Sequence, residues 1–285
     1  MRTVSLKLLT IIVVTLLFSG CSTQFGYRFA DTYLEYQLGK YVDLDDPLAG
    51  DVSASIDALH QWHAQTQMPA YADFLTELIN AVENDRIDAQ QLNQFADDAY
   101  RFWHTIRLEI EPYAQRYLPQ LSAAQRAQFI TKMREQITEE RVEELAQEPR
   151  KRQRERFQRT IDRAEEWLGR LAPEQERLLH RWMEQRERND ELWHRYQMQW
   201  LDSFERTIKN PSAEDFSASL EQLITNPEQF RSEELQQSSD YNRALTIEFF
   251  VAIYATMSVE QKRKVRNKLA DYRELVTDIH KDYAD

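Results

Sequence analysis

The sequence predicts an all-α protein, an elongated multi-helix bundle built from long amphipathic helices. Apolar residues recur at helical spacing through most of the chain, and charged residues make up 29% of it, which is typical of solvated helix faces. The 285 residues include only five glycines, and only Gly169 lies beyond residue 50. This scarcity excludes a P-loop or a Rossmann fingerprint and disfavours a sheet with tight hairpins.

The first expected helix follows residue 27 and places Phe29, Tyr33 and Tyr36 on one face. The sequence leaves two alternatives for these aromatic residues. They either pack on the body of the protein, which we favour, or lie at a membrane interface, where tyrosine is enriched.

Turn residues at 44–50 interrupt this pattern, and Ser53 or Ser55 is the expected cap of the next helix. Pro69 is expected to begin a further helix. Its apolar stripe comprises Tyr71, Phe74, Leu75, Leu78, Ile79 and Val82. Asp88 then opens a helix whose expected inner face is Leu92, Phe95, Ala99, Phe102, Trp103 and Ile106. Pro112 and Pro119 are expected to mark the turn after it.

A helix is predicted over 122–148, and the charge changes sign near Pro149. The basic run after Pro149 has the residues for binding phosphate or nucleic acid. Because Glu148–Arg152 and Glu155–Arg159 have i,i+4 spacing, we favour a solvated, salt-bridged face. A sub-boundary of the helical domain is placed near 148–172.

Residues 173–209 are predicted as one helix of about 55 Å, exposed or bent at 184–191, where no apolar residue occurs. Pro211 and Pro227 bracket a shorter helix. Residues 245–257 are apolar on nearly every face and are expected to be central. The last helix has the apolar face Val265, Leu269, Tyr272, Val276 and Ile279.

The first 20 residues predict a secretory signal, because a basic opening precedes an apolar run that ends at Phe18. Cys21, the single cysteine, follows Ser19-Gly20, and this stretch resembles the lipobox of bacterial lipoproteins, although Phe18 stands where leucine is usual. The resemblance implies acylation of Cys21 and, with Ser22 in place of aspartate, the periplasmic face of the outer membrane. The alternatives are an ordinary signal peptide or an uncleaved anchor. Residues 21–50 would form a membrane-proximal segment, and 51–285 the helical domain.

One helix-start pattern recurs, with an apolar residue, a small residue and a glutamine three positions later. It predicts capping boxes at Ser122/Gln125 and Ser258/Gln261, a related start at Ala172/Gln175, and a looser one at Asp88/Gln91. The pattern resembles the LTxxQ motif of small periplasmic stress chaperones, which bind unfolded clients.

A broader resemblance rests on Trp62-His63 and Pro69-Ala70-Tyr71 after a tyrosine-rich segment. These residues resemble the W-H-R and L-P-x-Y patterns of an uncharacterised family of all-helical bacterial lipoproteins. Ala64 and Met68 depart from those patterns. The resemblance implies location and fold, and no activity.

No catalytic motif occurs: H-E-x-x-H and G-x-S-x-G are absent. His60 and His63 share a helix face without a diagnostic third ligand, so we expect no metal and no cofactor. Trp182, Trp193 and Trp200 lie on a highly charged segment. Core packing is the favoured interpretation of these rings, and a partner surface is the alternative.

The net charge of -12 disfavours nucleic acid as a partner. The leading hypothesis is a lipid-anchored, non-enzymatic envelope protein that binds another envelope protein or acts as a chaperone. The alternatives are a structural envelope tether, and a ligand carrier or enzyme with a site between helices. The carrier or enzyme would require buried polar groups with shifted pKa values.

Overall fold

The computed structural model describes residues 20–284, and their side chains from residue 24 onward. Within this part of the chain the regular structure is helical and contains no strand, so the predicted all-α class is confirmed. The α-helices are α2 (Gly20–Tyr27), α3 (Ala30–Gly39), α4 (Leu48–Trp62), α5 (Met68–Glu83), α6 (Ala89–Tyr117), α7 (Ala123–Ala146), α8 (Pro149–Leu168), α9 (Pro173–Gln185), α10 (Asp190–Lys209), α11 (Phe216–Thr225), α12 (Glu233–Ala255) and α13 (Val259–Asp282). A π-helix, η1 (His63–Gln67), joins α4 to α5, and η2 (Leu118–Gln120) and η3 (Pro227–Phe230) are short 3-10 turns.

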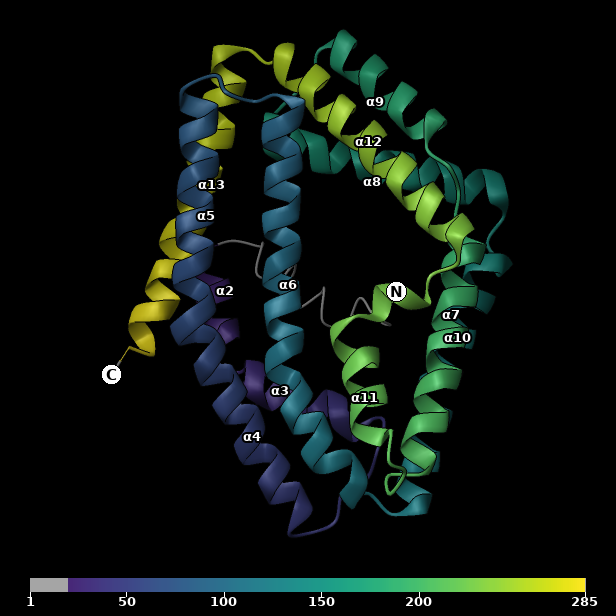
Figure 1. The fold of residues 1–285 in the computed structure, drawn as a ribbon. Helices are drawn as coiled ribbons and strands as arrows, with labels where there is room; N and C mark the ends of the chain where they lie inside the picture. The colour runs from purple at the N-terminus through teal and green to yellow at the C-terminus, as the bar shows by residue number, and fades with distance from the viewer. Residues whose placement is uncertain (1–19, 285) are drawn as a thin grey trace.

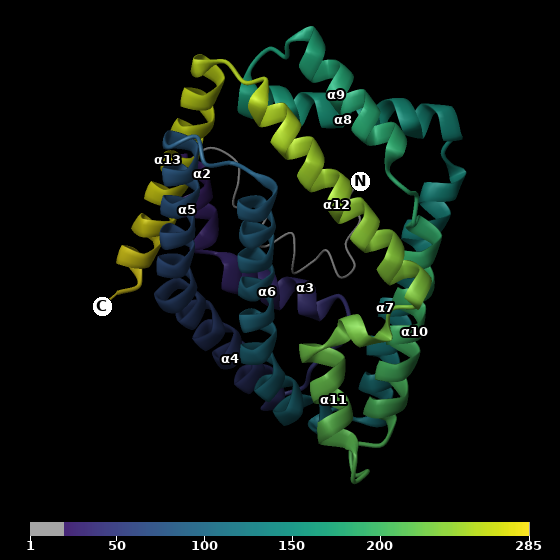
Figure 2. The same ribbon diagram turned by 45° about the horizontal axis from the view of Figure 1, so that its top comes forward.

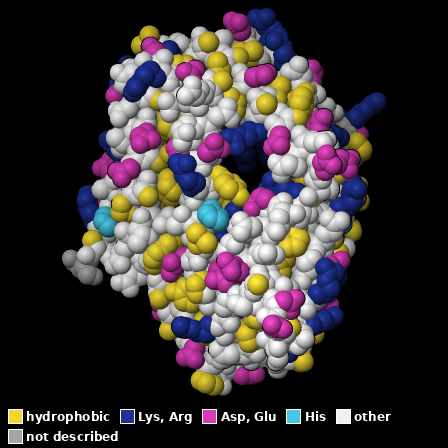
Figure 3. Space-filling model, viewed as in Figure 1, with side chains coloured by type: hydrophobic (Ala, Val, Ile, Leu, Met, Phe, Trp, Pro, Cys, Tyr) yellow, Lys and Arg dark blue, Asp and Glu magenta, His cyan; other side chains and the backbone are white. Residues whose placement is uncertain are grey.

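The helices form a frame around a central gap (Figures 1 and 2). Helices α4, α5 and α13 make one side, with α6 beside them. Helices α7, α10 and α11 make the opposite side, and α8, α9 and α12 lie across the top. The space-filling view shows the molecule hollowed between these sides, with cationic and acidic side chains around the hollow (Figure 3).

Apolar packing is divided among three clusters rather than gathered in one centre. The largest joins α7, α10 and α11 around Leu201 and Leu220. The second joins α2, η1, α5 and α13 around Met68 and Ile279, and the third joins α5 to α13 around Ile79. Each side of the frame therefore has its own buried core.

The apolar periodicity located several helices correctly. The α5 stripe packs on α13, whose Leu269, Val276 and Ile279 are buried as predicted. Helix α6 begins after Asp88, whose carboxylate accepts a hydrogen bond from the Gln91 backbone N–H at 2.8 Å. Pro211 and Pro227 do enclose α11.

Several predicted boundaries are wrong. Ser53 and Ser55 lie inside α4, which begins five residues earlier; their hydroxyls bond to Glu35 and to the Tyr117 hydroxyl instead. Pro69, by contrast, lies in the first turn of α5 as predicted, although η1 and not a loop joins α4 to α5. Pro112 lies within α6, which continues to Tyr117 while packing on α4 and α11.

The segment 173–209 is two helices, α9 and α10, separated at 186–189. The buried side chain of Asn242 satisfies the backbone of this break: Oδ1 accepts from the Glu187 N–H at 2.9 Å, and Nδ2 donates to the Glu187 carbonyl at 3.0 Å. Tertiary hydrogen bonds therefore stabilise a helix end that the local sequence leaves undecided.

Two further expectations concern α12 and the charged run. Helix α12 is not central: it lies across the top of the frame, and although Ile247 and Ile253 are buried, Phe250 is 48% exposed. The charged run after Pro149 is salt-bridged, with Arg159 3.8 Å from Glu155, whereas Glu148 caps α8.

No helix in the described part of the chain is long and apolar enough to cross a membrane.

Candidate functional site

Histidine and tyrosine side chains gather where α2, η1, α5 and the end of α13 meet. The cluster consists of Tyr27, His60, His63, Tyr71 and Tyr283, hereafter the His–Tyr cluster. Tyr27, from the N-terminal helix, is 4% exposed and lies 4.6 Å from the His60 ring, centroid to centroid. Its hydroxyl is 2.9 Å from His63 Nδ1, and the other ring nitrogen of His63 is 3.2 Å from the Tyr71 hydroxyl.

The π-helix lies at the centre of this arrangement. It carries one wide turn, in which the Met68 N–H bonds to the His63 carbonyl. The Ala64 carbonyl of the same turn faces His280 Nδ1 of α13 at 3.3 Å. A π-turn of this kind often accompanies functional positions in helices. Here it brings His63 between two tyrosines and joins the turn to the C-terminal helix.

Burial keeps the His–Tyr cluster uncharged. It lowers the pKa of His63 to about 4, and neighbouring His60 adds to the effect. Burial also lowers the pKa of His60, opposed by the carboxylate of Asp31, 3.6 Å away. The pKa values of Tyr27 and Tyr71 are raised, again mainly by burial. Near neutral pH these side chains are therefore uncharged, and they interact through hydrogen bonds and ring contacts.

The arrangement fixes α2 onto the rest of the molecule. Besides the buried ring of Tyr27, Gln24 and Arg28 each donate to the Asp282 carboxylate at 3.0 Å. Cys21 belongs to the same helix, although its side chain lies outside the described residues. The predicted lipidation position is therefore only a few residues from a rigid attachment.

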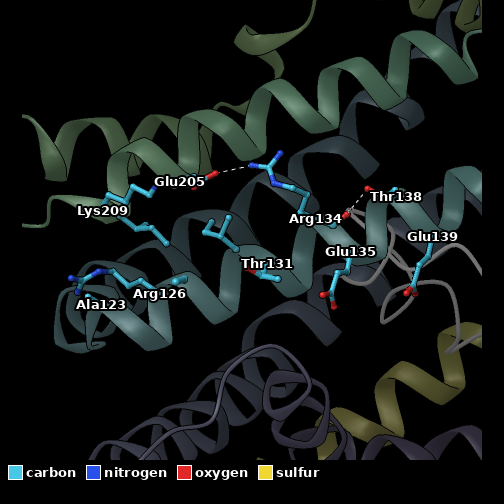
Figure 4. Close-up of a pocket in the computed structure, with 12 residues that line it drawn as sticks. Ala123, Arg126, Thr131, Arg134, Glu135, Thr138, Glu139, Glu205 and Lys209 are labelled. Atoms are coloured by element: carbon cyan, nitrogen blue, oxygen red, sulfur yellow. Dashed lines mark hydrogen bonds and ion pairs between the residues drawn. The ribbon is translucent and has the colours of Figure 1, made fainter.

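A groove lies between α7 and α10 and is lined by both apolar and charged residues (Figure 4). It has a volume of about 600 Å³. Apolar atoms of Ala123, Ala127, Ile130 and Ile208 contribute to its lining, and Arg134 bridges it by pairing with Glu205 at 2.7 Å.

Charges differ between the two ends of this groove. Arg126 and Lys209 lie toward one end, and Glu135 and Glu139 toward the other (Figure 4). Farther along α7, Val142 and Leu145 are each 60% exposed. At 100° per residue these two positions fall on the groove-lining face of α7.

The helix over 122–148 was predicted, but the groove on its exposed face was not. Ile130 and Ile137 are indeed buried against α10 and α11. The available signal was the pair of small residues Ala123 and Ala127, which lie at i,i+4 spacing on an exposed face.

The three predicted tryptophans are half-buried and pack against other side chains of the same chain. Trp182 stacks on Phe249 of α12 with ring centroids 4.9 Å apart, and its N–H donates to Thr246. Trp200 stacks on Phe204 and donates to the Leu223 carbonyl at 2.9 Å. Trp193 packs edge-on against Tyr196 beneath Arg231. The contacts fit the favoured packing interpretation, and a partner surface at these rings stays a prediction.

The predicted helix starts form as capping boxes at Ser122/Gln125 and Ser258/Gln261, and Gln175 accepts from the Ala172 N–H. In addition, Gln175 and Gln261 face each other, with reciprocal amide hydrogen bonds of 2.9 and 3.0 Å. Gln175 is fully buried. This pairing joins the starts of α9 and α13 and could not be read from either motif alone.

The fold and these sites define an all-helical protein with a fixed N-terminal helix and a surface groove. The chain belongs to DUF6279, a family of unknown function whose model matches residues 40–236. That range includes His60, His63, Tyr71 and the groove, but not Cys21, Tyr27 or α13. No curated protein and no solved structure matches the chain.

Proposed function

We propose that the protein is a lipid-anchored envelope protein that binds a partner protein in the α7–α10 groove and catalyses no reaction. In this proposal Cys21 is acylated and holds the molecule on the periplasmic face of the outer membrane. The groove is the observation that supports partner binding: Ala123 and Ala127 are exposed in it, basic residues lie at one end and acidic residues at the other.

The groove chemistry specifies the partner. An amphipathic helix would place its apolar stripe along the exposed Ala123 and Ala127, as in other helix-in-groove complexes. Its acidic end would lie near Arg126 and Lys209, and its basic end near Glu135 and Glu139. The partner is therefore expected to be a protein segment with one acidic and one basic end.

The fixed N-terminal helix supports the anchoring part of the proposal. One acyl chain gives only marginal membrane binding, so durable attachment needs several chains on Cys21. With Tyr27 buried six residues later, acylation there would hold the frame near the bilayer in a defined orientation. Palmitate labelling of the wild type and of Cys21→Ser tests this step. Label that survives the substitution would refute acylation at Cys21.

Partner binding is tested by a photo-crosslinking residue at exposed Thr131, followed by identification and purification of the captured protein. Ala127→Arg places a large cation in the groove and should weaken the affinity of that purified partner at least about tenfold. Ala124→Arg adds the same side chain on the same helix at an exposed position outside the lining, and should leave the affinity unchanged. Equal affinities of the two variants would contradict the groove as the binding site.

The His–Tyr cluster supports a second candidate function, a ligand carrier or enzyme, because it is a buried polar cluster with shifted pKa values. Most of its polar atoms already pair with one another, and only His60 Nε2 is buried without a partner. The two functions differ in one test. A His60→Gln variant that keeps partner affinity supports the groove, whereas loss of a co-purifying small molecule on that substitution would support the carrier.

A further inference from the structure

An exposed aromatic row runs along α2 and α3, directly after Cys21. Phe25, Phe29, Tyr33 and Tyr36 are 64%, 52%, 47% and 64% exposed. The expectation that the aromatic face of this segment packs on the body is therefore wrong: the buried side of the same helices is occupied instead by Tyr27 and Gln37. The first two rings touch edge to face at 5.1 Å, and the later two continue the row at i,i+4 and i,i+3 spacing.

The charges around this row differ from those of the whole chain. Its exposed cations are Arg28, which pairs with Asp282 at 3.0 Å, and Lys40, whose Nζ lies 4.3 Å above the Tyr36 ring. The two carboxylates of the segment turn away from the row, since Asp31 faces His60 and Glu35 accepts from Ser53. The net charge of the full chain is -12, yet none of its acidic side chains is exposed between residues 25 and 40.

The position of the row relative to Cys21 constrains what can cover it. Phe25 lies about 6 Å from Cys21 along the helix, and Tyr36 about 22 Å if the helical rise is carried through the turn at 28–29. Because Tyr27 and the Asp282 bonds hold α2 against the body, the row cannot swing free of the frame. A surface that receives Cys21 is therefore in reach of the four rings.

We infer that the aromatic row of α2 and α3 is a membrane-docking surface, in which the rings enter the lipid interface and Lys40 meets anionic headgroups. Aromatic rings are favoured at this depth, and cations near an anionic leaflet add to binding. The inference deepens the proposed anchoring, but it requires no acyl chain. The frame would then lie with this face on the bilayer, and acylation would make the contact durable.

The experiment uses the chain from residue 21 with Cys21→Ser, which keeps every described residue except Gly20 and carries no cysteine. A single cysteine introduced as Phe29→Cys carries an environment-sensitive fluorophore. The matched control is Val259→Cys, an exposed apolar position at the other end of α13, about 35 Å from the Asp282 contact. Vesicles contain phosphatidylethanolamine with phosphatidylglycerol, or phosphatidylcholine alone.

On the mixed vesicles the label at 29 should shift to shorter wavelength, and the label at 259 should not. In unlabelled protein, Phe25→Ser with Tyr36→Ser should lower the vesicle partition coefficient at least about tenfold, because two apolar side chains are lost from the contact. Both positions are exposed, so circular dichroism should show an unchanged fold. Weaker binding to phosphatidylcholine alone is expected from the loss of headgroup attraction.

Equal emission at positions 29 and 259, or equal partition of wild type and the double variant, would overturn the inference. The inference would also be overturned if the emission of the label at position 29 shifted on addition of a purified protein and not on addition of vesicles. That result would assign the row to a protein partner. Acylation is not involved in these measurements. Failure here would leave the palmitate test untouched, and failure of that test would leave the docking surface standing.

Discussion

At the residue scale, His63 shows how a histidine can serve a fold without charge or metal. Its ring nitrogens face the hydroxyls of Tyr27 and Tyr71, so each hydroxyl either donates to the ring or accepts from it. The free energy of burying the imidazole is kept low because the ring is neutral and because both of its nitrogens form hydrogen bonds. Sequence spacing placed His60 and His63 on one face. The contact of His63 with Tyr27 could not be predicted from the local sequence, because the two residues are 36 positions apart.

Acid should therefore weaken the fold through His63. Its folded pKa of about 4 is below the unfolded value of about 6.5, so the unfolded chain binds more protons between these limits. The stabilisation is complete above about pH 6.5 and is lost as the pH falls toward 4, by at most about 3 kcal/mol. Urea unfolding at pH 7 and pH 4.5 measures the loss.

His63→Gln keeps a polar side chain that does not titrate, so its free energy of unfolding should change less between these two pH values than that of the wild type. His180→Gln, at an exposed position, should behave like the wild type. An unaltered pH dependence in His63→Gln would show that other groups govern acid sensitivity.

At the element scale, the capping glutamines do more than end helices. Gln125 accepts from the Ser122 N–H and also donates to the Asp43 carbonyl at 2.8 Å, which ties the 41–46 segment to α7. Gln175 and Gln261 tie α9 to α13. Each glutamine oxygen serves its own helix, and each amide nitrogen reaches another segment.

Substitution of Gln175 should lower the free energy of unfolding more than substitution of Gln125, because Gln175 is the more buried of the two. Gln175→Ala removes a fully buried amide and leaves the Ala172 N–H and the Gln261 amide without their partner, so we expect a loss of about 2–3 kcal/mol. Gln125→Ala leaves groups that water can reach and should cost about 1 kcal/mol. Chemical denaturation of both variants compares them, and equal losses would argue against the buried pair as a special contact.

The same scale shows what the sequence could and could not predict. Local rules sufficed where a helix is defined by its own residues, as in the α5 stripe, the Asp88 cap and the two serine capping boxes. They failed at 186–189, where Asn242 stabilises the break, and at η1, where the wide turn depends on contacts with α2 and α13. The groove likewise could not be predicted from the local sequence, because it forms only when α7 and α10 pack together.

At the scale of the whole molecule, α13 closes the frame. It packs along α5 and α2 and also contacts α8, so the end of the chain joins the N-terminal side to the top. The apolar clusters at Leu220 and Ile279 nevertheless share no buried residue and lie on opposite sides of the frame. Packing of this kind favours partial openings on one side at a time.

Core truncations should therefore act regionally. Leu220→Ala and Ile279→Ala each remove a side chain that is at most 1% exposed, and each should cost about 2–5 kcal/mol within its own cluster. Hydrogen exchange followed by mass spectrometry should show faster exchange in α7, α10 and α11 for Leu220→Ala, with α5 and α13 still protected. Ile279→Ala should give the reverse pattern. Because α6 packs on both sides, it should accelerate modestly in both variants. Uniform acceleration across all helices in either variant would show instead that the closed frame opens only as one cooperative unit.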